Sequence, residues 1–231
     1  MMKELPYRTA LIVGAGAGIS ASLARGLAAA GVQVGLAARN ADKLAPLAAE
    51  IGAQTFAVDA SDPAAVERLF TDADARLGEP DVVVYNASGR TRGPLVELDP
   101  QAVLKAITIS AYGGFLVAQQ AARRMTPRGK GAILLTGASA SVKGFALSAA
   151  FAMGKFALRG LAQSAARELG PKGIHVAHFV IDGGVRSATR PDQGDNMLDP
   201  DAIAQTYIDV LRQPRSAWSL EVELRPWVET F

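Results

Sequence analysis

The sequence predicts an α/β fold built on a single doubly wound parallel sheet with helices on both faces. Short runs rich in valine, isoleucine and leucine alternate with longer helical patterns along the chain, and the first run leads directly into G-A-G-A-G. The 231 residues are 49% hydrophobic, which is enough for one large core. Nothing resembles a linker, so we expect one domain over residues 1–231.

Six apolar runs are the expected strands of this sheet. They are apolar at nearly every position, which indicates strands covered on both faces, as in a parallel sheet. The runs are T-A-L-I-V from residue 9, V-Q-V-G-L-A from 32, Q-T-F-A-V from 54, D-V-V-V-Y from 81, A-I-L-L-T from 132 and I-H-V-A-H-F-V-I from 174. A seventh stretch, L-E-V-E-L-R-P from 220, alternates in polarity and predicts a final strand at the sheet edge.

Helices are expected between these strands, near residues 18–30, 41–50, 62–77, 100–125, 148–169 and 200–212. The alternation predicts βαβ units with right-handed crossovers, so the carboxyl ends of all strands meet at one edge. Ligands bind at that edge in open α/β sheets. The polar segment 183–200, which follows the sixth strand, is therefore predicted to cover the substrate there.

Composition narrows the chemistry that the chain can perform. It contains no cysteine, which excludes disulfides, thiolate catalysis and cysteine-ligated metals and fits the cytoplasm. His175 and His178 fall on opposite faces of one strand, so we expect no metal site from them. Thr9–Ala24 is uncharged like a signal peptide, but its glycine-rich centre and the helical pattern that continues past it indicate part of the fold.

Two further stretches bear on possible partners. The run Ala106–Ala122 is uncharged, but its hydroxyls, glutamines and glycines make it too polar for a membrane helix. The formal net charge is only +2, and one basic cluster lies where a helix is expected to end, which favours a solvated helix end over a nucleic-acid surface. That cluster consists of Arg123, Arg124, Arg128 and Lys130.

The turn V-G-A-G-A-G-I-S, residues 13–20, joins the first strand to the first helix. Glycines at this junction allow a tight turn and let a pyrophosphate approach backbone N–H groups at the helix N-terminus. Gly14 and Gly18 are the predicted functional glycines. Gly16 is either needed for the same approach or a bystander, and we favour the bystander.

Two polar residues follow the second and third strands. Arg39 stands where a dinucleotide fold places the residue that distinguishes its ribose, and a guanidinium there pairs with the extra phosphate of NADP. The alternative is an ordinary surface arginine before a helix. Asp59 ends the third strand and can accept a hydrogen bond from an adenine amine, whereas Ser61 or Asp62 is better placed to cap the next helix.

Together these motifs resemble the short-chain dehydrogenase/reductase family over nearly the whole chain. G-A-G-A-G-I-S is similar to the family's T-G-x-x-x-G-I-G, N-A-S-G at 86–89 to its N-N-A-G, F-A-M-G-K at 151–155 to its Y-x-x-x-K, and D-G-G-V-R-S at 182–187 to its P-G-x-V-x-T. The resemblance implies a single NAD(P)-binding Rossmann-like domain, hydride exchange between the nicotinamide and an alcohol or carbonyl, and dimers or tetramers.

The resemblance also implies a set of cofactor-binding residues. Three positions depart from the motifs: Val13 replaces the threonine, Ser20 the third glycine and Asp182 the proline. The implied cofactor-binding residues are Gly14, Gly16, Gly18, Ile19, Arg39, Asp59, Ala60, Asn86, Ala87, Gly89 and Lys155.

The catalytic part of the resemblance is degenerate. Phe151 stands at the position of the catalytic tyrosine, Ala138 at that of the serine and Ser110 at that of the helix asparagine, and only Lys155 matches. Phe151 has no proton to transfer, and its alternative role is core packing. The i to i+4 spacing places Lys155 on the same helix face, although a solvated lysine is the other interpretation.

Three hydroxyls lie near these positions, those of Ser139, Ser148 and Tyr112, and we expect a structural role for each. The favoured function is therefore an NADP(H)-dependent oxidoreductase whose proton comes from Lys155, water or the substrate. The alternatives are a dinucleotide-binding protein without turnover, acting as a sensor or interaction partner, and a structural subunit of a mixed oligomer. We expect a homodimer or homotetramer that associates through the helices 100–125 and 148–169.

Overall fold

Seven parallel strands form one sheet in the order β3-β2-β1-β4-β5-β6-β7 in the computed structural model, which describes residues 5–229. The predicted doubly wound sheet is thus confirmed. The order in which strands are added reverses between β1 and β4, because β1 to β3 extend to one edge of the sheet and β4 to β7 to the other. The strands are β1 (Thr9–Val13), β2 (Gln33–Ala38), β3 (Gln54–Ala57), β4 (Val82–Tyr85), β5 (Gly131–Thr136), β6 (Ile174–Ile181) and β7 (Glu221–Leu224).

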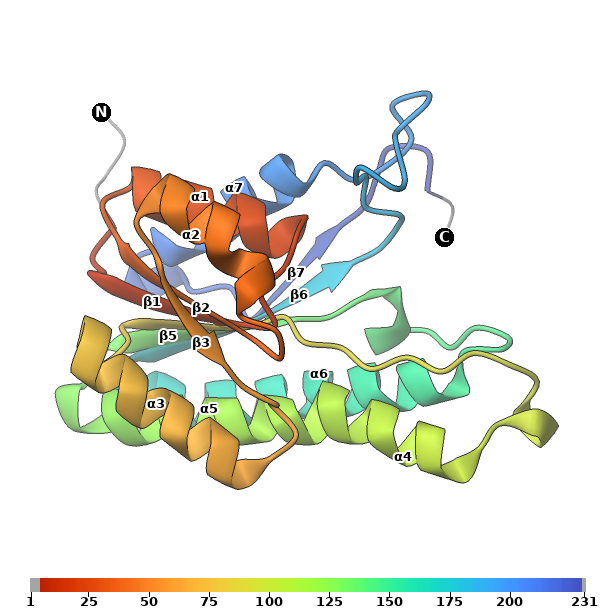
Figure 1. The fold of residues 1–231 in the computed structure, drawn as a ribbon, viewed down its shortest axis with the longest axis horizontal. Coiled ribbons are helices and arrows are strands. Elements are labelled where there is room, and N and C mark those ends of the chain that lie inside the picture. The colour runs from red at the N-terminus through yellow and green to blue at the C-terminus, as the bar shows by residue number, and fades with distance from the viewer. Residues whose placement is uncertain (1–4, 230–231) are drawn as a thin grey trace.

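Helices cover both faces of the sheet (Figure 1). One face carries α1 (Ile19–Ala29), α2 (Ala45–Ile51) and α7 (Pro200–Leu211), and α1 packs directly against α7. The other carries α3 (Pro63–Leu77), α5 (Gly113–Arg128) and α6 (Ala149–Leu169), with α4 (Pro100–Ile107) continuing toward one end. The strands between the two edges send alternate side chains into two separate apolar cores, so Leu11 and Ile12 belong to different ones.

Three helices begin at an aspartate that is followed by proline. The carboxylates of Asp62, Asp99 and Asp199 each accept a hydrogen bond from a backbone N–H of the first turn. Proline suits the next position because a backbone N–H there has no partner within a helix, so its absence costs nothing. The expectation that Asp62 caps α3 is confirmed.

The expected helix 100–125 is interrupted by a wider, π-helical turn at Thr108–Tyr112, and it continues to Arg128. Tyr85 is buried beneath this turn and its hydroxyl donates a hydrogen bond to the carbonyl of Ile109. A Cβ atom at Gly113 would lie 2.4 Å from that hydroxyl, so the helix passes close to β4 at this point. The wide turn therefore fits the helix around a buried tyrosine.

The continuous helical stretch Pro100–Arg128 is the one helix within residues 5–229 that is long and apolar enough to cross a membrane by length and composition. Its second half is α5, whose Leu116, Val117, Ala121 and Met125 are buried against the sheet. Such burial is that of a core helix, and it accounts for the apolar composition.

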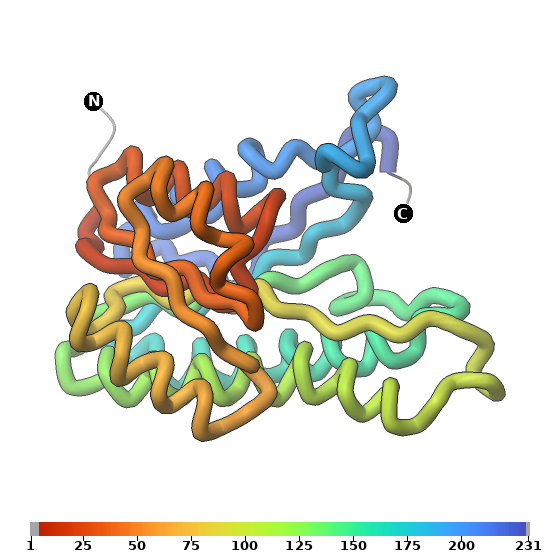
Figure 2. Tube along the Cα trace, in the orientation of Figure 1, coloured from red at the N-terminus to blue at the C-terminus, as the bar shows by residue number. Residues whose placement is uncertain are grey.

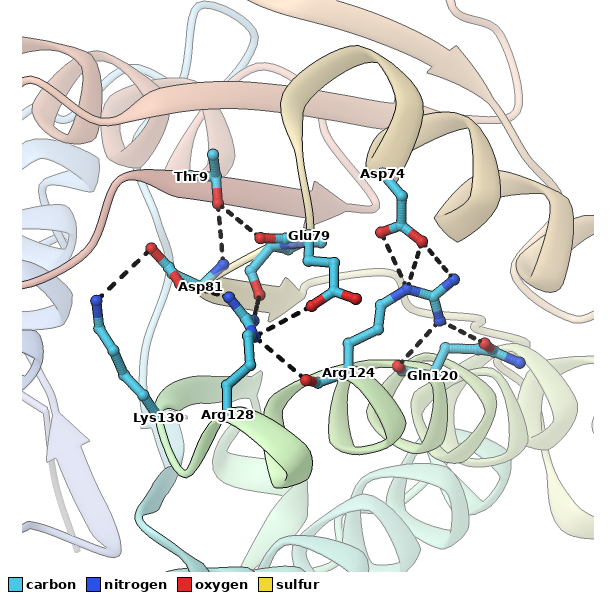
Figure 3. Close-up of polar contacts among 9 residues, drawn as sticks. Thr9, Asp74, Glu79, Asp81, Gln120, Arg124, Arg128 and Lys130 are labelled. Atoms are coloured by element: carbon cyan, nitrogen blue, oxygen red, sulfur yellow. Dashed lines mark hydrogen bonds and ion pairs between the residues drawn. The ribbon is translucent and has the colours of Figure 1, made fainter.

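The basic cluster lies at the end of α5 and faces carboxylates (Figure 3). Arg124 is 2.7 Å from Asp74 of α3, and Arg128 is 2.9 Å from Asp81, which precedes β4. Lys130 lies 3.9 Å from the same Asp81, while Arg123 is exposed. These pairs hold the end of α5 to its neighbours.

The carboxyl ends of the strands lie opposite the basic cluster and carry the long connections. Figure 2 shows that the segments after β4, β5 and β6 all extend beyond the same end of the sheet, with the start of α4 below them. Three segments distant in sequence thus meet where the strands end.

Candidate functional site

The turn after β1 has the backbone conformation that its glycines permit. Gly14 has a φ of 85° and Gly18 a φ of 94°, which side chains rarely allow. A Cβ atom at Gly14 would also lie 2.3 Å from the backbone nitrogen of Ala87, so the turn packs tightly against the segment after β4. Gly18 precedes Ile19, the first residue of α1, where no side chain caps the helix and no acidic residue occupies the first turn. That helix N-terminus is open to an anion.

A hollow of about 790 Å³ adjoins this turn. Seven of the eleven predicted cofactor-binding residues line it: Gly14, Gly16, Arg39, Asp59, Ala60, Asn86 and Ala87. The other lining residues are Val13, Ala15, Ala17, Ala38, Asn40, Lys43, Leu44, Val58, Ser88 and Ile109, whereas Gly18, Ile19, Gly89 and Lys155 are outside it.

Gly16 has a different position from Gly14. A Cβ atom there would meet no protein atom within 4 Å, although Gly16 lines the hollow. Protein packing therefore does not require this glycine, which leaves both a ligand contact and the bystander role open to it.

Ser20 and Asn86 join the turn to the end of β4. The Asn86 amide donates to the Ser20 hydroxyl at 2.8 Å, and that hydroxyl donates to the Gly14 carbonyl at 3.3 Å. Ser20 is buried, so the residue at the family's third glycine position serves as a link between two loops.

Two cations and one carboxylate lie together in the hollow. Arg39 and Lys43 are exposed, and Arg39 is close enough to Asp59 to interact with its charge. Asp59 accepts two hydrogen bonds from Ser61, at 2.6 Å from the hydroxyl and 2.9 Å from the backbone N–H. These bonds are the main reason why the pKa of Asp59 lies below its usual value, and the charge of Arg39 lowers it further. Lys43 was not among the predicted residues.

Lys155 is buried in α6, and only 3% of the residue is exposed. Its Nζ donates a hydrogen bond of 2.7 Å to the carbonyl of Thr136, the last residue of β5. Burial, and secondarily the nearby Arg90 guanidinium, lower the pKa of Lys155 to about 7. The alternative of a solvated lysine is therefore wrong, because Lys155 is buried and hydrogen-bonded inside the fold.

Phe151 lies one helical turn before Lys155 and is partly buried. The guanidinium of Arg90 stacks on its ring, with Cζ 4.0 Å from the ring centroid, and Lys155 Nζ lies 5.9 Å from that centroid. Phe151 therefore contacts the Arg90 guanidinium besides packing in the fold. Arg90 was not predicted, although its place directly after N-A-S-G, at the carboxyl end of β4, was a usable signal.

Ser110 lies in the wide turn of the long helix and is completely buried. Its hydroxyl accepts from the Gly89 N–H at 3.0 Å and donates to the Gly89 carbonyl at 3.3 Å. Neighbouring space is limited, because a Cβ atom at Gly154 would lie 2.7 Å from the Cβ of Ser110. Ser110 thus holds the segment after β4 against the helices.

Ala138 follows β5, and its backbone N–H donates to the buried Ser141 hydroxyl at 3.1 Å. The three nearby hydroxyls, for which a structural role was expected, lie in three different settings. Tyr112 is 44% exposed and stacks with Phe115, Ser148 is the N-cap of α6, and Ser139 begins a short 3₁₀ turn.

The two histidines have separate surroundings. His175 donates a hydrogen bond of 2.8 Å from Nε2 to the Ser219 carbonyl and stacks on Trp218, whereas His178 lies 3.0 Å from Glu221. Burial lowers the pKa of His178 to about 4, so it is neutral near pH 7. Among residues 5–229, no group of three or more metal-binding side chains gathers.

The segment after β6, predicted to cover the substrate, folds back on itself at the carboxyl end of the sheet. Val185 pairs with Leu198 in an isolated bridge, and Arg186 lies 2.7 Å from Asp199 at the start of α7. Asp182, at the family's proline position, is buried 3.4 Å from Lys143.

Comparisons with known proteins agree with this geometry. The family model described as short chain dehydrogenase matches residues 8–197. A sorbitol dehydrogenase from Cereibacter sphaeroides is 33% identical over 186 residues, which cover 78% of this chain and 73% of that one.

Two solved structures are similar over nearly all of the chain. A short-chain dehydrogenase from Rhodopseudomonas palustris is 37% identical with a TM-score of 0.84, over 95% of this chain and 99% of that one. A metagenomic short-chain oxidoreductase in complex with NADP is 29% identical with a TM-score of 0.86, over 98% and 100% of the two chains.

Proposed function

The chain belongs to the short-chain dehydrogenase family, and we propose that it is an NADP(H)-dependent oxidoreductase that interconverts a carbonyl compound and an alcohol. One observation carries this proposal: a single hollow joins the glycine turn, the cations after β2, Asp59 and Asn86. The members of this family bind NAD(P), and the hollow fits such a dinucleotide. Its phosphates would lie against the uncapped N-terminus of α1, where Gly16 leaves open space.

NADP(H) is the preferred cofactor in this proposal. Arg39 and Lys43 line the same hollow and neither forms an ion pair within residues 5–229, so both are available to a 2′-phosphate. No acidic side chain stands at position 38, where it would accept from the 2′-hydroxyl of NAD. A relative solved with NADP is consistent with this choice.

Lys155 supplies the proton in this mechanism. Bound NADPH provides a hydride, which is the chemistry of that cofactor, and a carbonyl oxygen then needs a proton. The Lys155 ammonium, whose pKa is about 7, is a better acid than an ordinary lysine and is hydrogen-bonded beside Phe151. General acid catalysis contributes roughly 10²–10⁴ to a rate, so losing the phenol slows the reaction without abolishing it.

A second candidate function is a dinucleotide-binding protein without turnover. Phe151 favours it, because a phenyl ring stacked under Arg90 has no transferable proton. Both candidates require cofactor binding, and only the first requires consumption of NADPH.

The decisive experiment titrates purified protein with NADPH and NADH by fluorescence and then screens carbonyl compounds for NADPH consumption. We expect tighter binding of NADPH, and Arg39→Ala should remove most of the preference while Lys43→Ala reduces it. Equal affinities in the unmodified protein would contradict the cofactor choice. Binding without consumption of any carbonyl would favour the second candidate.

We also propose that the protein is a cytoplasmic homodimer or homotetramer. Helices α4, α5 and α6 and the wide turn expose large apolar side chains, namely Leu104, Tyr112, Phe115, Met153 and Phe156. Such a surface supports association between copies. The cysteine-free composition supports a reducing compartment.

A further inference from the structure

Arg90 and Phe151 form a stacked pair beside Lys155, and Arg90 follows Ser88 of the hollow by two residues. The guanidinium lies over the ring at 4.0 Å from its centroid, which is close contact for a cation–π pair. Gly93 N–H donates to the Leu147 carbonyl at 3.1 Å, which ties the segment carrying Arg90 to the start of α6, which carries Phe151. The two side chains are thus held on two connected elements.

The stacked guanidinium keeps its donors available. Stacking uses the flat face of the group, whereas its N–H bonds point outward in the plane and match the two oxygens of a carboxylate. Within residues 5–229, Arg90 has no acidic partner and no hydrogen-bond acceptor, although the residue is exposed enough to meet a ligand.

The charge near this pair is unbalanced. Arg90 and Lys155 both lie close to the Phe151 ring, and the charge of Arg90 acts against protonation of Lys155. Asp182, the buried carboxylate that follows β6, is engaged by Lys143 and Arg225. Within residues 5–229 neither Arg90 nor Lys155 forms an ion pair, so both cations would attract a bound anion.

We propose that Arg90 is a specificity-determining residue that binds the carboxylate of the substrate, so that the natural substrate is a 2-oxo acid or the corresponding 2-hydroxy acid. This inference rests on the proposed oxidoreductase function. The carboxylate pairs with Arg90, and the neighbouring carbonyl then lies on the side of Lys155. Stacking on Phe151 fixes the plane of the Arg90 guanidinium. The phenyl ring at the tyrosine position thus orients the group that binds the substrate.

The test compares benzoylformate with its methyl ester, because the two share one ketone and differ in charge. Each is titrated by calorimetry into the protein saturated with NADP⁺, where no reduction takes place, and into the protein alone. We expect the acid to bind at least tenfold more tightly than the ester. Arg90→Gln should weaken acid binding at least tenfold and leave ester binding unchanged, with Arg90→Lys between the two.

Arg92→Gln is the matched control, since Arg92 is an exposed arginine two residues away, and it should change neither affinity. Initial rates of NADPH-dependent reduction of both compounds give a second readout. If NADP⁺ binds but acid and ester bind alike, or Arg90→Gln affects both equally, the carboxylate assignment is wrong while the oxidoreductase proposal stands. If no dinucleotide binds, the proposed function fails, and the comparison on protein alone still decides the role of Arg90.

Discussion

Replacing Lys155 with methionine should change how the stability of the protein depends on pH. In the unfolded chain the amine titrates near 10.5, whereas in the folded protein burial lowers its pKa to about 7. Between these values the unfolded state binds one more proton than the folded state, so the free energy of unfolding rises with pH. Below pH 7 both states are protonated and the cost of burying the charge is fully present.

The magnitude follows from the size of the shift. Each pKa unit corresponds to about 1.4 kcal/mol, so the full difference amounts to about 5 kcal/mol. Between pH 7 and pH 9.5 the unmodified protein should gain about 3 kcal/mol relative to Lys155→Met. The upper limit of pH 9.5 avoids titration of the buried tyrosines. Burial raises the pKa of Tyr7 to about 12, and it also raises the pKa of Tyr207.

Urea unfolding at several pH values between 6.5 and 9.5 measures this difference. Lys172→Met, at an exposed lysine beside Glu168, is the matched control for the substitution itself. Parallel stability curves for the unmodified protein and Lys155→Met would refute the reasoning, because a lysine that remains charged in the fold contributes no such slope.

Three further predictions concern the glycine turn, the phenyl ring and the surface. Gly14→Ala should destabilise the fold by about 2 kcal/mol or more, since it combines a positive φ with a backbone clash, whereas Gly16→Ala should leave thermal unfolding nearly unchanged and weaken NADPH binding. Phe151→Tyr with Ala138→Ser should raise NADPH-dependent reduction of simple diketones by roughly tenfold or more, and normal NADPH binding without any gain would indicate a pocket unfit for hydride transfer. Phe156→Glu should shift light scattering toward the monomer, and an unmodified protein already monomeric at micromolar concentration would contradict the proposed association.

Much of the fold was predictable because its signals are local. Each buried strand is a continuous apolar run, and the helix starts at Asp62 and Asp199 lie at aspartate–proline pairs. The wide turn at Thr108–Tyr112 was not predictable in this way. It depends on the Tyr85 hydroxyl, which comes from a strand more than twenty residues earlier.

In the candidate site, too, local features were predictable and features that depend on distant elements were not. Gly14 and Gly18 were predicted because their motif lies in one short turn, and the structure gives both a positive φ. Lys43 and Arg90 were missed, because spacing along the chain does not show which cations converge on a pocket. Whether a lysine such as Lys155 is buried depends equally on neighbouring elements.

The packing around Ser110 has a consequence for substitutions at both positions of this contact. Its hydroxyl holds both backbone groups of Gly89, and the missing side chain of Gly154 lets α6 approach the Cβ of Ser110. A side chain at position 154 would therefore push α6 away from the wide turn. An asparagine at position 110 would replace one hydroxyl by a carbonyl and an amide, so its effect would reach the segment after β4 as well as the proton supply.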